Sequence, residues 1–208
     1  DPTITPFGAH RFLRYASVAL RDDKEVVLAA VSKHGANLEF ASELMKDDEE
    51  VVWTATLQWG PAIQFASERL RGDRDFILNL FNGLSLQYAP EYIRDDRAIV
   101  LAAVAQNVDA FQFASERLKN DHGTVLAAVA QNGEALQFAS PRLQDDRQIV
   151  MAAIQNWPEA LGFASDERKD DSDVVIAAAC RRRFVLRFAS PRLKGDREFA
   201  LTLIREST

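Results

Sequence analysis

The sequence has only one cysteine, Cys180, among its 208 residues. A lone cysteine can form no internal disulfide, so packing must hold the fold together, and an intracellular or organellar compartment is mildly favoured. Charged or turn-forming residues return often, and no run approaches the roughly 18 apolar residues that a membrane span needs. The sequence therefore predicts no membrane span.

Residues that carry chemistry are also sparse. Histidine occurs three times, at His10, His34 and His122, without clustered cysteines, which argues against a zinc site. The nine glycines are scattered and form no phosphate-binding loop, dinucleotide fingerprint or nucleophile elbow. No histidine lies near Cys180 to complete a nucleophilic pair, so we interpret Cys180 as a packed structural residue. We predict no catalytic residue, no metal, no cofactor and no small-molecule substrate.

The composition is that of a soluble folded protein, with 47% hydrophobic and 27% charged residues. The formal net charge of −6 at pH 7 opposes nonspecific binding to nucleic acid or to anionic membranes by the chain as a whole. We therefore expect neither to be the main partner.

The sequence does contain a repeat of 25 residues. Each unit opens with an aspartate, and an aromatic residue followed by alanine recurs in step with it. The opening aspartates are Asp23, Asp48, Asp73, Asp96, Asp121, Asp146, Asp171 and Asp196. The aromatic residues are Tyr15, Phe40, Phe65, Tyr88, Phe113, Phe138, Phe163 and Phe188. One interval in each series is 23 residues, which places a two-residue deletion between Asp73 and Tyr88 and predicts a clipped first helix there.

Each unit predicts three helical pieces. The opening aspartate is a good N-cap for a first helix of about 11 residues, whose apolar circumference indicates burial on more than one side. A second helix of about 7 residues carries the Leu-x-Phe-Ala pattern, in which we expect the aromatic residue to fill the core. A single helical turn follows, and Asp, Asn or Gly before each opening aspartate predicts a left-handed turn. Four first helices are expected to end at glycine, at Gly35, Gly60, Gly83 and Gly133.

These pieces predict an all-α fold, an α-solenoid of short two-helix repeats that forms a single domain over residues 1–208, with residues 1–11 as a lead-in. A leucine-rich repeat has a similar period but needs an extended Leu-x-Leu strand, which is missing. Neither end completes a unit, so we expect a processed protein or part of a longer one. The last helix should leave an apolar face at Phe199, Leu203 and Ile204.

The unit, written DRxIVLAAVxQNGxALxFASxRLKND, resembles the DUF4116 repeat family, a domain of unknown function. The resemblance runs from about Phe12 to Leu203 and is closest in residues 96–118 and 121–143. It implies a short α-helical repeat and brings no activity, cofactor or catalytic residue with it. The departures from the pattern are the clipped third unit, Arg168 at a leucine position, and Arg181-Arg182-Arg183 at the usual Gln-Asn-Gly turn.

The candidate binding residues are those that vary on this constant frame. The turn after the first helix carries His34, Trp59, Asn82, Asn107, Asn132, Trp157 and Arg182, which we expect to line one edge. Trp59 and Trp157 could anchor a partner, because aromatic residues dominate binding hot spots, or each indole could fold back over its own second helix. A second ladder, Glu39, Gln64, Gln87, Gln112, Gln137, Gly162 and Arg187, could contact a ligand or simply bond to backbone and face water.

A basic segment lies near the C-terminal end. Residues 177–197 hold seven basic side chains and one acid, a local charge of +6 against −12 for the rest of the chain. Such a patch could grip phosphates or an acidic protein, or it could be a solvated end. The candidate residues are Arg181, Arg182, Arg183 and Arg187.

The leading functional hypothesis is a noncatalytic protein-interaction scaffold, a module or accessory subunit of a larger assembly. A modular RNA-binding array is the first alternative, because each unit could present side chains to one base. The second alternative is the non-catalytic part of a larger enzyme or effector whose active site lies in flanking regions. We expect a protein partner at the tryptophan edge, at the basic segment or at the apolar face of the last helix.

Overall fold

The computed structural model describes residues 12–80 and 84–206. The elements in these two ranges are helical, and no strand occurs in them, which confirms the predicted all-α class. The predicted lead-in and two predicted turn residues, Asn82 and Gly83, lie outside the described residues.

Each repeat opens with an α-helix of ten residues, except in the third repeat, where the helix has six and the predicted clipping is confirmed. These first helices are α2 (Lys24–Lys33), α4 (Glu49–Gln58), α6 (Arg74–Asn79), α8 (Arg97–Gln106), α10 (His122–Gln131), α12 (Arg147–Asn156), α14 (Ser172–Arg181) and α16 (Arg197–Glu206).

The second helix of each repeat is a 3₁₀ helix, and the third piece is one α-helical turn. The 3₁₀ helices are η1 (Phe12–Tyr15), η2 (Gly35–Phe40), η3 (Gly60–Phe65), η4 (Leu84–Tyr88), η5 (Val108–Phe113), η6 (Gly133–Phe138), η7 (Pro158–Phe163) and η8 (Arg183–Phe188). The single turns are α1 (Val18–Arg21), α3 (Glu43–Lys46), α5 (Glu68–Arg71), α7 (Glu91–Arg94), α9 (Glu116–Lys119), α11 (Pro141–Gln144), α13 (Asp166–Lys169) and α15 (Pro191–Lys194).

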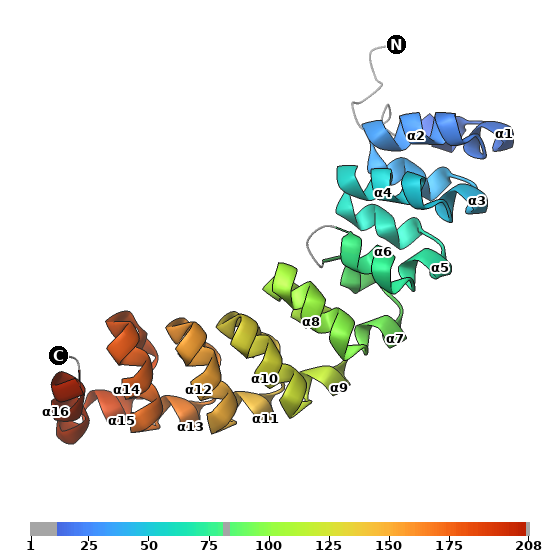
Figure 1. Ribbon diagram of the computed structural model, residues 1–208. Coiled ribbons are helices and arrows are strands. Elements are labelled where there is room, and N and C mark those ends of the chain that lie inside the picture. Colours follow the sequence, from blue (N-terminus) through green and yellow to red (C-terminus); the bar gives the residue numbers. More distant parts are fainter. Residues whose placement is uncertain (1–11, 81–83, 207–208) are drawn as a thin grey trace, which may run out of the picture. The chain divides into compact units, whose positions relative to one another are not determined.

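The chain divides into two compact units, each of which contains several repeats. The first unit runs up to Arg94, and the second unit starts at Asp95. In the first unit α2 packs against α4, and η2, η3 and η4 contact one another in chain order. In the second unit α8, α10, α12, α14 and α16 lie side by side in chain order (Figure 1), and η5 to η8 make a second row of contacts. In the second unit, the inner helices α10, α12 and α14 therefore pack against the repeats before and after them, as their apolar circumference predicts.

The opening aspartates cap the first helices, as predicted. In α10 the Asp121 carboxylate accepts hydrogen bonds from the backbone amide and the hydroxyl of Thr124, at 2.8 Å and 2.7 Å. The first of these bonds satisfies a backbone amide that a helix start otherwise leaves without a partner. The same role belongs to Asp23, Asp48, Asp73, Asp96, Asp146, Asp171 and Asp196.

The residue before the opening aspartate is not left-handed at any of the seven positions given below, so that prediction is wrong. Its φ lies between −96° and −105° and its ψ near 0° at Asp22, Asp47, Gly72, Asn120, Asp145, Asp170 and Gly195. The residue closes the preceding single turn, and its amide donates to carbonyls of that turn. Right-handed geometry suits this hydrogen bonding, so another property must select Asp and Asn there.

That property is a side-chain bridge between repeats, here called the clasp. The Asp47 carboxylate accepts hydrogen bonds from the Ser67 hydroxyl and from Arg69 Nε, the latter at 2.9 Å, while Arg69 Nη2 binds the Asp47 carbonyl oxygen at 2.8 Å. The serine follows the acceptor by twenty residues and the arginine by twenty-two. The clasp recurs at Asp95–Ser115–Arg117, Asn120–Ser140–Arg142 and Asp170–Ser190–Arg192.

Two departures from the repeat are modified clasps. Glu167 stands where the arginine is expected, and Arg168 replaces it, with Nε 3.3 Å from the Asp145 carboxylate. In the first unit, Gly72 and Tyr92 replace the aspartate and the arginine together. A Cβ at Gly72 would lie 1.8 Å from the Tyr92 hydroxyl oxygen, so glycine leaves room for that ring.

The buried residues of the second helix are spaced by the 3₁₀ period, and the recurring aromatic residue is not among them. A 3₁₀ helix has three residues per turn, so residues i and i+3 share a face. Leu136 and Ala139 of this face are 0% and 6% exposed, whereas Phe138 between them is half-buried. In η5 the buried position is Phe111, at 0% exposure, and Phe113 is half-buried. The prediction that the recurring aromatic fills the core is therefore wrong.

Three of the glycines assigned to helix ends, Gly35, Gly60 and Gly133, begin the 3₁₀ helices instead. The first helix is closed by the extended residue before the glycine, as at Asn132, with φ −150°. A Cβ at Gly133 would lie 2.4 Å from the Ala153 carbonyl oxygen and 2.9 Å from Trp157 Cβ. Glycine is required because the next repeat approaches its backbone closely.

Candidate functional site

The predicted edge residues occupy equivalent positions, as the extended residues that end the first helices. Their φ lies between −142° and −156° at His34, Trp59, Asn107, Asn132, Trp157 and Arg182. Asn82, the remaining member, lies outside the described residues.

The asparagines at this edge form hydrogen bonds within their own repeats. Asn107 Oδ1 accepts a hydrogen bond from the Asp109 amide at 2.9 Å, and Asn132 Oδ1 accepts one from the Glu134 amide at 3.0 Å. Both side chains therefore cap the following 3₁₀ helix. In the parallel ladder, Gln112 Nε2 donates to the Asp109 carbonyl oxygen at 3.0 Å, within its own repeat.

The two edge tryptophans fold back over their own 3₁₀ helices. The ring centroids of Trp59 and Phe65 are 6.2 Å apart, and those of Trp157 and Phe163 are 5.9 Å apart and stacked. Both indoles are half-buried. The alternative in which each indole folds back over its own second helix is therefore confirmed. Only part of each indole is available to a partner.

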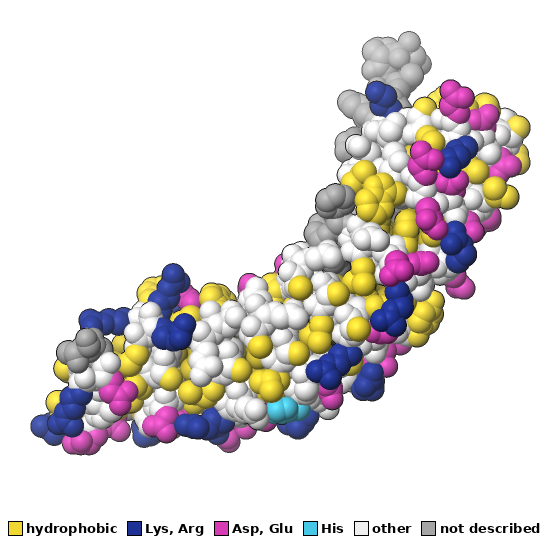
Figure 2. All heavy atoms as spheres, viewed as in Figure 1, with side chains coloured by type: hydrophobic (Ala, Val, Ile, Leu, Met, Phe, Trp, Pro, Cys, Tyr) yellow, Lys and Arg dark blue, Asp and Glu magenta, His cyan; other side chains and the backbone are white. Residues whose placement is uncertain are grey.

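The four candidate arginines are all exposed, but their surroundings differ. Arg182 forms an ion pair with Glu159 of the previous repeat, and the hydrogen bond from Arg182 holds the pKa of that carboxyl below its usual value. Arg181 and Arg183 make no ion pair among the described residues. Figure 2 shows Lys and Arg side chains gathered over the end of α14.

Arg187 is held against two phenylalanine rings. Its guanidinium carbon lies 4.1 Å from the ring centroid of Phe184 and 4.4 Å from that of Phe188. Lys194 Nζ donates to the Arg187 carbonyl oxygen at 2.7 Å. Gly162 of the previous repeat makes room for Phe188, because a Cβ there would lie 3.0 Å from the ring. The Arg187 guanidinium therefore lies against both rings while the residue remains exposed.

Phe184 is the residue that the sequence analysis missed. Its side chain is 63% exposed, beside Arg183 and in contact with Arg187. Arg181, Arg183, Phe184 and Arg187 are here named the Arg–Phe surface. A signal was present in the second unit, because the three positions equivalent to Phe184 there hold acids, at Asp109, Glu134 and Glu159, whereas the first unit has Ala36, Pro61 and Leu84.

Other candidate features resolve simply. Cys180 is exposed, with its sulfur 3.7 Å from the Glu206 carbonyl oxygen, so the prediction of a packed cysteine is wrong. Phe199 is only 8% exposed, whereas Ile204 is 66% exposed, so the expected apolar face of α16 is narrower than predicted. Over residues 12–80 and 84–206, no group of three His, Cys, Asp or Glu side chains is placed to hold a metal. None of the helices described is long and apolar enough to cross a membrane.

Comparison with known families agrees with this repeat structure. The sequence profile of the family described as Domain of unknown function (DUF4116) matches residues 10–46, 48–81, 80–119 and 121–169. No curated protein matches the chain, and no solved structure matches it. The matches cover more than half of the chain, and the same helical pattern continues beyond them through α14 and α16. The chain therefore belongs to the DUF4116 family.

Proposed function

We propose that the chain is a noncatalytic protein-interaction module that binds its partner through the Arg–Phe surface. The observation that carries this proposal is the exposed Phe184 ring, which lies against Arg187 at a position where η5, η6 and η7 of the same unit each have an acid. Aromatic and arginine side chains contribute most of the energy of many protein interfaces.

The packing of Arg187 supports the same proposal. An arginine that is already ordered loses little conformational entropy on binding. The Arg187 guanidinium lies over two rings, which restrict the orientations open to it. Because the surface is basic, the partner it suits is an acidic or phosphate-bearing protein.

The RNA-binding alternative has less support. A base-reading array needs polar side chains that are free to contact bases in every repeat. Asn107 and Asn132 instead cap 3₁₀ helices, and Gln112 bonds to a carbonyl of its own repeat.

The experiment is affinity capture from native extract, with nuclease-treated and untreated samples, followed by mass spectrometry. We expect the intact chain to retain a protein in both samples. The variant Arg183→Ser/Phe184→Ser/Arg187→Ser should retain about tenfold less of it, because the variant removes the aromatic and two arginines of the surface.

The matched control is Arg97→Ser/Arg147→Ser, which removes two exposed arginines from helix starts in the same unit. It should capture as much protein as the unaltered chain. Capture that depends on intact RNA, or equal losses in both variants, would contradict the proposal.

A further inference from the structure

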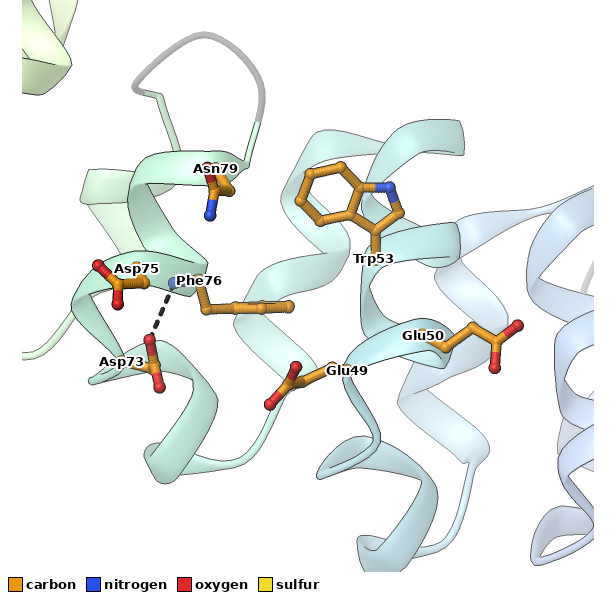
Figure 3. A pocket seen from close by; sticks show the side chains of 7 residues that line it. All are labelled: Glu49, Glu50, Trp53, Asp73, Asp75, Phe76 and Asn79. Atoms are coloured by element: carbon orange, nitrogen blue, oxygen red, sulfur yellow. Dashed lines mark hydrogen bonds between the residues drawn. The ribbon is translucent and has the colours of Figure 1, made fainter.

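The first unit has a hollow between α4 and α6 with aromatic walls and an acidic rim. Its volume is about 520 Å³, within the range of ligand pockets. Trp53 and Phe76 point toward one another across it (Figure 3), with ring centroids 6.5 Å apart at an interplanar angle of 67°. Trp53 is half-buried, and Phe76 is 8% exposed. The rim carries Glu49, Glu50, Asp73, Asp75 and Asn79.

This hollow is a departure from the repeat. The position of Trp53 holds leucine at Leu28, Leu78, Leu101 and Leu126. The equivalent hollow in the second unit lies between α10 and α12 and is lined by Leu126, Arg147, Gln148, Met151, Ala152 and Gln155, with no carboxylate. The frame therefore requires neither the indole nor the acids.

The carboxylates of the rim are engaged to different degrees. Glu50 pairs with Lys24 at 2.9 Å and points away from the hollow in Figure 3. Asp73 caps α6 through the Phe76 amide. Glu49 lies 3.6 Å from Arg69, whose closer partner is Asp47 at 2.9 Å. Asp75 is exposed and makes no ion pair among the described residues.

We propose that this hollow binds an arginine side chain of a partner protein, an inference that rests on the proposed interaction role but uses a different surface. A guanidinium can stack on an indole face and donate to carboxylates in its own plane. Trp53 supplies the face and Glu49 on α4 supplies an acceptor, while Asp75 adds negative charge to the α6 rim, with its carboxylate pointing away from the indole in Figure 3. The negative rim favours a cation, and the aromatic walls favour one that is planar and weakly hydrated.

The test is ¹H–¹⁵N NMR of the full chain titrated with N-acetyl-arginine methylamide. The neutral isostere N-acetyl-citrulline methylamide serves as the control probe. We expect the arginine probe to shift the Trp53 indole signal and the Phe76 amide, with affinity about fivefold or more above that of citrulline. Amides of Leu126 and Met151, which line the hollow without carboxylates, should not shift.

Two variants test the residues of the hollow. Trp53→Leu introduces the residue that most of the other repeats have at this position, so it should keep the fold and remove the shift at Phe76. Glu49→Gln/Asp75→Asn changes exposed groups only and should weaken the arginine probe about fivefold. Loss of the probe's effect in these variants, with an unchanged spectrum elsewhere, supports the site.

Several results would overturn the inference. Equal binding of citrulline, or no shift with the arginine probe, would show that the hollow does not recognise a guanidinium. The same shifts with magnesium chloride alone would make the hollow a cation site, and the same shifts on raising the protein concentration alone would make a second copy its occupant. The probe needs no natural partner, so a failed capture experiment would end the proposed function and leave this result standing.

Discussion

At the residue scale, two neighbouring positions in each repeat have different functions. Asp48 caps α4, whereas Asp47 before it accepts hydrogen bonds from Ser67 and Arg69 of the next repeat. The capping role could be predicted from sequence because its partners lie within three residues. The clasp could not, because its partners lie about twenty residues away, and Asp and Asn also tolerate a left-handed backbone.

The clasp predicts a pH dependence of stability. Hydrogen bonds from Ser67 and Ser165 lower the pKa values of Asp47 and Asp145, and a bond from Arg192 lowers that of Asp170. As pH falls, the unfolded chain therefore binds protons before the folded chain does, so this stability is present above about pH 4 and is lost as pH falls through the depressed folded values. Urea unfolding at several pH values should show this fall, and Asp47→Asn should reduce it. Stability that stays constant or rises as pH falls below about 4 would contradict the assignment.

Two glycines provide a second prediction at this scale. Gly133→Ala should destabilise the fold by about 1–3 kcal/mol, because the new Cβ would meet the Ala153 carbonyl oxygen at 2.4 Å. Gly195→Ala should be neutral or stabilising by up to about 1 kcal/mol, because φ is −97° and the nearest atoms lie at 3.7 Å. Chemical denaturation of both variants measures the difference. A loss of stability in Gly195→Ala would contradict this assignment and favour a left-handed backbone at that position.

At the element scale, the sequence predicted the number and order of the helical pieces and the shortened α6. It did not predict the 3₁₀ period of the second helix, because six residues are too few to separate a period of 3.0 from one of 3.6. That difference turned the recurring aromatic away from the core. Phe184 and Trp53 were missed for a related reason, since an apolar residue in a helix is usually buried.

The 3₁₀ period predicts unequal roles for two phenylalanines in η5. Phe111→Ala should destabilise the fold by about 3–5 kcal/mol, because its side chain is fully buried. Phe113→Ala should cost less than half as much, because Phe113 is half-buried. Urea unfolding of the two variants tests this order. Equal losses, or a larger loss at Phe113, would mean that the core face is wrongly assigned.

At the scale of the whole molecule, each compact unit combines a recurring frame with a few departures from it. The caps and clasps recur, whereas the Arg–Phe surface in the second unit and the α4–α6 hollow in the first do not. A residue that recurs in every repeat has a structural role in the fold. Exposed aromatic and charged groups that do not recur are therefore the best candidates for binding.

Hydrogen exchange of the chain alone and in complex with its captured partner tests this account most directly. We predict slower exchange on binding in residues 181–188, which carry the Arg–Phe surface. Unchanged exchange there, with protection instead in residues 199–206 of α16, would place the partner on the end of the second unit and contradict the account.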